Sequence, residues 1–93
     1  MVIGLLTLEL RFPDALTLKD KRSLTRPLLE GIRRQWNVSA AETGHRDSWQ
    51  RATFAVATVN TESAEAHRTL EAVARHAGRG NGAELLDYSI ELL

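Results

Sequence analysis

The chain has 93 residues, 43% of them hydrophobic and 26% charged, and its formal net charge is zero. That length fits one domain around one core, and the apolar content excludes a disordered chain. Because there is no cysteine, disulfides, thiolate metal sites, iron–sulfur clusters and cysteine nucleophiles are excluded. The apolar run at Val2–Leu6 is too short and too interrupted for a membrane span or a signal peptide. We therefore expect one cytoplasmic domain over residues 1–93, with no membrane partner.

The charges are unevenly distributed along the chain. The segment from Thr17 to Trp36 has six basic residues against two acidic ones, a balance of +4, so the remainder carries −4. The basic residues of this segment are Lys19, Lys21, Arg22, Arg26, Arg33 and Arg34. The sequence therefore predicts one basic element on an acidic body.

Hydrophobic spacing predicts a strand and then a helix in the first half. Apolar and polar residues alternate from Val2 to Phe12, as in a strand with one buried face. A helix is expected from about Thr17 to Gln35, with a hydroxyl cap at its start. Its apolar arc is formed by Leu24, Leu28, Leu29 and Ile32. Pro27 lies inside this span and predicts either a kink or a later start near Ser23.

A hairpin is predicted in the middle of the chain. The segment Asn37–Thr43 has weak strand character because it is rich in alanine, so we expect an edge strand there. Gly44–Ser48 forms a polar turn, and Arg51–Val59 resumes an apolar strand pattern.

The last third predicts a helix and a closing strand. Asn60 or Thr61 caps the helix, which ends at Gly78 in the left-handed conformation. A turn at Gly80–Gly82 then leads to a strand that begins near Leu85.

This β-α-β-β-α-β order predicts an α+β fold, the ferredoxin-like sandwich, in which a four-stranded antiparallel sheet carries two helices on one face. The first and third strands are expected at the centre of the sheet. The residues predicted to face the helices are Leu6, Leu8, Leu10, Phe54, Val56, Leu86, Tyr88 and Ile90. The other sheet face is expected to be open.

No motif in the sequence points to a catalytic or metal centre. The histidines His45, His67 and His76 do not converge as metal ligands would. Ser48, His45 and Asp47 lie close in sequence, but in a polar turn. The acids Glu9, Asp87 and Glu91 share the open face with Arg11, which would neutralise them. We expect no enzyme activity, no metal and no cofactor; an enzyme would need a closed pocket joining Glu42, His45, Asp47 or Trp49.

Four basic residues fall on one side of the first predicted helix and form a basic stripe beside its apolar arc: Lys19, Arg22, Arg26 and Arg33. Arginines in such a stripe can bind phosphates, which favours contact with RNA, although a solvated charged face is the simpler alternative. The candidate RNA contacts are Lys19, Lys21, Arg22, Arg26, Arg33 and Arg51. Trp49 could stack on a base or cover the core, and we favour the core.

The open face also predicts an oligomer contact. Apolar residues at one end of this face would form a patch of the kind that usually packs against a partner. The candidate interface residues are Ile3, Leu5, Ala57, Val59 and Leu85. We expect a homo-oligomer, most simply a dimer.

Several stretches of the sequence resemble the YlxP-like family of small bacterial proteins, known as domain of unknown function 503. The resemblance covers nearly the whole chain and rests on Ile3-Gly4-Leu5-Leu6, Leu18-Lys19-Asp20-Lys21-Arg22, Asn37-Val38-Ser39 with Ala41-Glu42, and Trp49-Gln50-Arg51-Ala52. It implies a ferredoxin-like fold and no established enzymatic activity. Genes of this family often stand beside those for translation and ribosome maturation factors, which implies a role near the ribosome. Pro27 departs from the family pattern.

Two functions follow as hypotheses. The first is a non-enzymatic accessory protein that contacts ribosomal RNA, or a ribosome assembly intermediate, through the basic helix. The alternative is a dimeric interaction or regulatory module that docks on a protein partner by its open sheet face or an edge strand.

Overall fold

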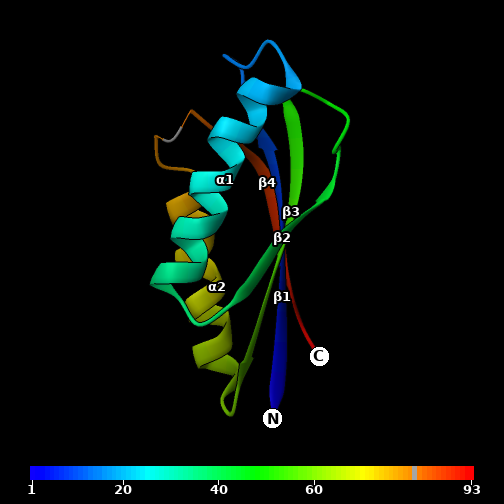
Figure 1. Cartoon of the computed structure of the whole chain (residues 1–93). Helices are drawn as coiled ribbons and strands as arrows, with labels where there is room; N and C mark the ends of the chain where they lie inside the picture. The colour runs from blue at the N-terminus through cyan, green and yellow to red at the C-terminus, as the bar shows by residue number, and fades with distance from the viewer. Residues whose placement is uncertain (81) are drawn as a thin grey trace.

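The computed structural model describes residues 1–80 and 82–93, and its elements follow the predicted order (Figure 1). They are β1 (Val2–Arg11), α1 (Leu18–Gln35), β2 (Ser39–Gly44), β3 (Arg51–Asn60), α2 (Ser63–Ala77) and β4 (Glu84–Leu92). The strands form one antiparallel sheet in the order β2-β3-β1-β4, with β1 and β3 central. Both helices lie on the same side of it. The predicted ferredoxin-like fold is confirmed.

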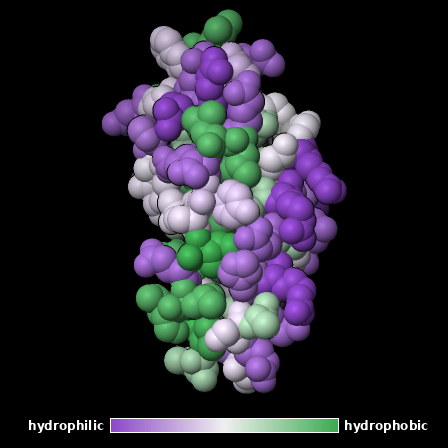
Figure 2. Space-filling model, turned by 180° about the vertical axis from the view of Figure 1, so that it is seen from behind, coloured by the Kyte–Doolittle hydropathy of each residue, from purple (hydrophilic) through white to green (hydrophobic). Residues whose placement is uncertain are grey.

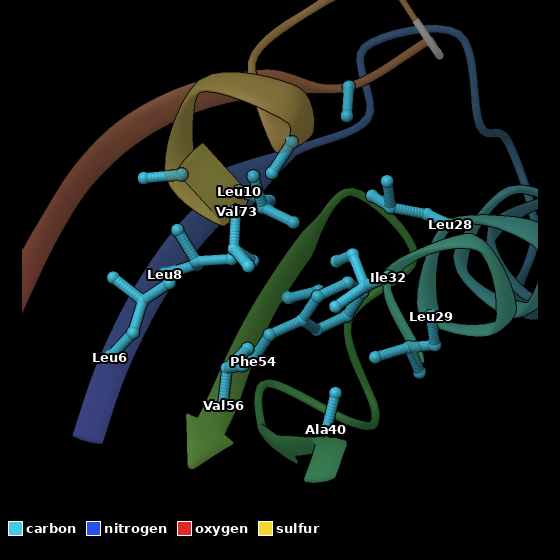
Figure 3. Packing of buried hydrophobic residues seen from close by; sticks show 14 of the residues in the cluster. Leu6, Leu8, Leu10, Leu28, Leu29, Ile32, Ala40, Phe54, Val56 and Val73 are labelled. Carbon is cyan, nitrogen blue, oxygen red and sulfur yellow. The ribbon is translucent and has the colours of Figure 1, made fainter. Parts of the chain in front are cut away.

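The core lies between the sheet and the helices. Alternate residues of β1 point to the helices, so Leu6, Leu8 and Leu10 have no exposed surface. They pair with β3 residues on the same face, with Leu8 opposite Phe54. Figure 3 shows α1 directing Ile32 toward Phe54, while α2 contributes Val73. In both central strands, the residues predicted to face the helices are therefore the ones that form the core.

Helix α1 begins at its predicted cap and continues through proline. The hydroxyl of Thr17 accepts a hydrogen bond of 3.1 Å from the backbone N–H of Asp20, which satisfies one free donor of the first turn. The alternative start near Ser23 is wrong, because the helix runs unbroken from Leu18. Pro27 and Ser23 are exposed, so water can replace the backbone bond that proline removes.

The last strand differs from the prediction. A register shift between Glu9 and Leu10 moves the pairing from Glu9–Asp87 to Leu10–Leu85, which leaves Leu86 as an extra residue. As a result Leu85 packs against the core, whereas Leu86 is 46% exposed. The predicted core role of Leu86 is wrong for this reason.

Tyr88 is also outside the core. It faces the helices but lies on an edge strand, and it is 39% exposed. Its hydroxyl donates a hydrogen bond of 2.9 Å to the carboxylate of Glu71 on α2. This hydrogen bond, with the negative charge of Glu71, raises the pKa of Tyr88 above its usual value. The prediction that Ile90 belongs to the core is partly right, because Ile90 packs against the core but remains partly exposed.

The ends of α2 were predicted within a few residues. Glu62 is the residue at its N-terminal cap, and Asn60 assists through a hydrogen bond from the Glu62 N–H to its side-chain oxygen. Gly78 has a φ of −83°, so the predicted left-handed conformation is wrong there. Gly80 adopts it instead, with φ 67°. Of the predicted turn, residue 81 lies outside the described residues.

No helix among the described residues is long and apolar enough to cross a membrane.

Gly4 lies where β1 packs closely against Leu70 of α2. A Cβ added at Gly4 would lie 2.8 Å from Cδ1 of Leu70, a fully buried side chain. We expect Gly4→Ala to lower the free energy of unfolding by about 1–3 kcal/mol, because the packed core must shift. Gly31→Ala is the control: its nearest neighbour is His76 at 3.9 Å, so we expect no loss and a gain of up to about 1 kcal/mol. Urea unfolding of both variants measures the difference, and equal stabilities would contradict the close approach.

Candidate nucleic-acid interface

Lys21 occupies the centre of the contact between α1 and the hairpin. Its side chain is only 2% exposed, and its Nζ donates to the carboxylate of Glu42 at 2.9 Å. It also donates to two backbone carbonyls, those of His45 at 3.0 Å and Arg51 at 3.1 Å. All three ammonium donors are thereby used, which is what a buried lysine requires.

The predicted RNA contact at Lys21 is therefore wrong, because this charge is turned inward and fully satisfied. A signal for its burial was present in the sequence. Lys21 lies three residues before Leu24 and seven before Leu28, on the apolar arc of the helix rather than on the basic stripe. A charge at such a position predicts an internal partner.

Two further predicted contacts are also engaged elsewhere. Arg33 donates through Nε to the backbone carbonyl of Ala40 at 3.1 Å, which ties the end of α1 to β2. Arg51 lies opposite Arg11 in the register of β3 and β1, on the sheet face away from the helices. Its guanidinium lies 4.0 Å from the carboxylate of Glu9. The structure therefore does not bring Arg51 together with the basic residues of α1.

Three of the predicted residues do share one exposed surface. Lys19, Arg22 and Arg26 are exposed and, with Ser23 and Pro27, line a shallow hollow of about 480 Å³. Within residues 1–80 and 82–93, none of the three cations has a side-chain partner. We call Lys19, Arg22 and Arg26 the basic surface. Their unpaired charges are available to an anionic partner.

The turn between β2 and β3 extends this surface. A second hollow, of about 460 Å³, lies between α1 and the turn and is lined by Leu18, Lys21, Arg22, Glu42, Arg46 and Asp47. Trp49, two residues further on, is 54% exposed. The favoured interpretation of Trp49 as a cover for the core is therefore wrong. Trp49 is instead an exposed residue of the turn whose two ends accept hydrogen bonds from Lys21 of α1.

The polar residues of the turn have structural contacts. The Ser48 hydroxyl accepts from the backbone N–H groups of Gln50 at 3.3 Å and Arg51 at 3.1 Å. Gln50 in turn donates to the carbonyls of Pro13 and Ala15. In the part of the chain that the structure describes, no group of three or more His, Cys, Asp or Glu could hold a metal ion.

The open sheet face has an apolar end. Ile3 and Val59 are neighbours across the strands and are 36% and 62% exposed. Leu93 exchanges two backbone hydrogen bonds with Ile3 and is 72% exposed. Leu5 and Ala57 form the next pair. Figure 2 shows hydrophobic side chains gathered in the lower part of the molecule, the end where both termini lie in Figure 1.

Leu85 does not belong to this apolar end. It pairs with Leu10 at the opposite end of β1 and packs against the core. The register shift in β4 is the reason, because it turns Leu85 toward the helices. The interface predicted at Leu85 is therefore wrong.

A family model described as "Protein of unknown function (DUF503)" matches residues 3–90. The chain belongs to this family. A relative, "Uncharacterized protein YlxP" of Bacillus subtilis (strain 168), is 33% identical over 72 residues, which cover 77% of this chain and 78% of the relative. The resemblance inferred from the sequence is confirmed, and the family is one whose function is uncharacterised.

Two designed proteins of known structure are similar in fold. The designed protein Foldit4 aligns with a TM-score of 0.54 at 14% identity, covering 98% of this DUF503 chain and 96% of the design. The designed protein LFR1 1 with ferredoxin fold aligns with a TM-score of 0.55 at 11% identity, covering 100% of this chain and 84% of the design. At these identities the likeness concerns the fold alone.

Lys21→Met tests the buried contact. Glu42, whose side chain is 17% exposed, loses its charge partner, so we expect the free energy of unfolding to fall by about 3–5 kcal/mol. Adding Glu42→Leu should recover part of this loss because no unpaired charge then remains. Lys19→Met is the control on the exposed side of the same turn and should change stability by less than about 0.5 kcal/mol. Equal effects of the two lysine variants in urea unfolding would contradict the role of Lys21.

Proposed function

We propose that this protein is a non-enzymatic accessory protein that binds RNA, with ribosomal RNA or a ribosome assembly intermediate as its partner. The observation that carries the proposal is the basic surface, where Lys19, Arg22 and Arg26 are exposed and unpaired within the described residues. The phosphate backbone supplies most of the affinity of a protein for nucleic acid, and it needs cations that are not already used.

The spacing of these cations suits a phosphate chain. Residues three and four apart lie on one side of a helix, so Lys19, Arg22 and Arg26 follow one line. Lys19 and Arg26 are seven positions apart, which is a rise of about 10 Å along the helix axis. Stacked nucleotides rise by about 3.4 Å each, so this line matches about three of them.

The acidic residues of the sheet favour a single orientation for RNA. The closing strand carries Glu84, Asp87 and Glu91, and all three are exposed. Glu84 is paired with Arg11 at 3.5 Å, so Asp87 and Glu91 are the acids that repel a polyanion. Helix α1 packs against β2, at the other edge of the sheet, and its basic surface attracts the polyanion. The formal net charge of the chain is zero, but its positive and negative charges lie on different surfaces. An RNA strand is therefore drawn toward one surface of the protein.

Replacing Lys19, Arg22 and Arg26 together by Ala tests the proposal. We expect weaker binding to a labelled ribosomal RNA fragment and a salt dependence whose log–log slope falls by about 2, because about three single-strand phosphate contacts are lost. Fluorescence anisotropy at several salt concentrations measures both quantities.

The matched control is the triple replacement of Arg68, Arg75 and Arg79 by Ala, which removes the same charge from α2 and the residues after it. It should keep most of the affinity. Absence of binding at low salt, or equal losses in the two triple variants, would sink the proposal.

A second candidate function is that of a dimeric interaction or regulatory module that docks on a protein partner. The observation that favours it is the apolar end of the open face, where Ile3, Val59 and Leu93 are exposed side by side. Clustered exposed apolar residues usually mark a contact with another protein. A second copy of the chain would cover this end with the same residues, as in a two-fold dimer.

Val59→Glu tests the dimer by placing a charge on an exposed residue of the apolar end, beside Ile3. We expect the wild-type protein to show the mass of a dimer by light scattering at micromolar concentration, and the variant to show that of a monomer. Ser89→Glu is the control, because it adds the same charge to the same sheet face beside Thr7, away from the apolar end. A wild-type monomer at every concentration would refute this candidate.

A further inference from the structure

We propose that the hollow between α1 and the β2–β3 turn holds one nucleotide of a single-stranded RNA. Trp49, which follows the lining residue Asp47 by two positions and lies outside the lining, stacks on the base of an adjacent nucleotide. In this arrangement Arg22 and Arg46 bind a phosphate, and Asp47 accepts a hydrogen bond from a ribose hydroxyl. The inference rests on the proposed RNA binding and specifies the strand type that the site accepts. It adds residues of the hairpin turn to the basic surface of α1.

The hollow is large enough for a small ligand, and charged side chains form most of its lining. Its volume is about 460 Å³, within the range of small-molecule pockets. Lys21 and Glu42 are paired with each other in its wall. Arg22, Arg46 and Asp47 have no side-chain partner in the described parts of the chain. Two cations and one carboxylate are therefore available to a ligand.

This mixture of charges selects among anions. A bare phosphate or an acidic peptide would gain from Arg22 and Arg46 but would be repelled by Asp47. A ribonucleotide brings both a phosphate for the arginines and a hydroxyl donor for the carboxylate. The 2′-hydroxyl is the group that distinguishes RNA from DNA at such a contact.

The exposed ring of Trp49 favours a single-stranded RNA over a duplex. Trp49 is 54% exposed on a turn that is held in place. The Ser48 hydroxyl accepts from the N–H groups of Gln50 and Arg51, and the Gln50 side chain donates to the carbonyl of Pro13 in the β1–α1 loop. A large apolar ring kept exposed on a fixed segment suits stacking on a base. Bases of a duplex do not offer their faces, whereas those of a single strand do.

Lys21 fixes the position of the β2–β3 turn relative to α1. Its bonds to the carbonyls of His45 and Arg51 hold both ends of the turn against α1. Arg46 therefore stays at the hollow that Arg22 lines. A preformed site loses less entropy on binding than one that must be assembled.

Intrinsic fluorescence gives a direct readout. The chain has two tryptophans, and Trp36 packs edge-on against His76 with ring centres 5.3 Å apart. In a Trp36→Phe background Trp49 is the sole tryptophan. We expect its emission to be quenched by a ten-nucleotide single-stranded RNA of mixed sequence, and to change little with a blunt duplex of the same sequence.

Affinities of three variants complete the test. Trp49→Ala should weaken binding of the single strand about ten-fold, while Leu16→Ala, which removes another exposed apolar side chain from the neighbouring loop, should leave it unchanged. Arg46→Ala should weaken it as well. Asp47→Asn should reduce the preference for the RNA strand over the DNA strand of the same sequence.

The outcomes separate this inference from the proposed function. If the duplex binds as tightly as the single strand and Trp49 emission does not respond, the nucleotide site is overturned while RNA binding by the basic surface stands. If neither RNA binds at low salt, the proposed function fails and the inference fails with it. Quenching by the single strand that is lost in Arg46→Ala supports the site.

Discussion

The ammonium group of Lys21 is the contact on which the arrangement of α1 and the β2–β3 turn depends. It joins three segments that are distant in sequence: the first turn of α1, the end of β2 and the start of β3. Without it the carboxylate of Glu42 and two carbonyls would be left without a charged donor in a nearly buried position. Together with Gln50, which donates to the carbonyls of Pro13 and Ala15, this charge fixes the position of the hairpin turn.

The charged residues are distributed unevenly over the surface of the fold. The hydrophobic core is ordinary for a helix layer on a sheet, with Leu8, Phe54 and Ile32 at its centre. The surfaces differ, because α1 carries six of the twelve basic residues, whereas β4 carries three acidic residues and no basic one. A fold shared with designed proteins that have no natural role says nothing about function, so the proposals rest on these surfaces.

Alternation and helical spacing predicted most of the fold. The central strands and the capped first helix follow from patterns that extend over ten residues or more, where one face must be buried along its whole length. The errors fall where a local irregularity changes the pattern. One extra residue at Leu86 exchanged the roles of Leu85 and Leu86, and such a bulge leaves no mark in a strand that is apolar at both positions.

The sequence by itself determined the family, the order of the elements, the two central strands and the basic character of the first helix, because these depend on composition and on periodic burial. Only the tertiary structure decided which basic residues are available. Lys21 and Lys19 are two residues apart in one basic segment, yet one is buried against Glu42 and the other is exposed. Burial of a charge depends on which carbonyls and carboxylates the fold brings within reach of it, and those come from other segments of the chain.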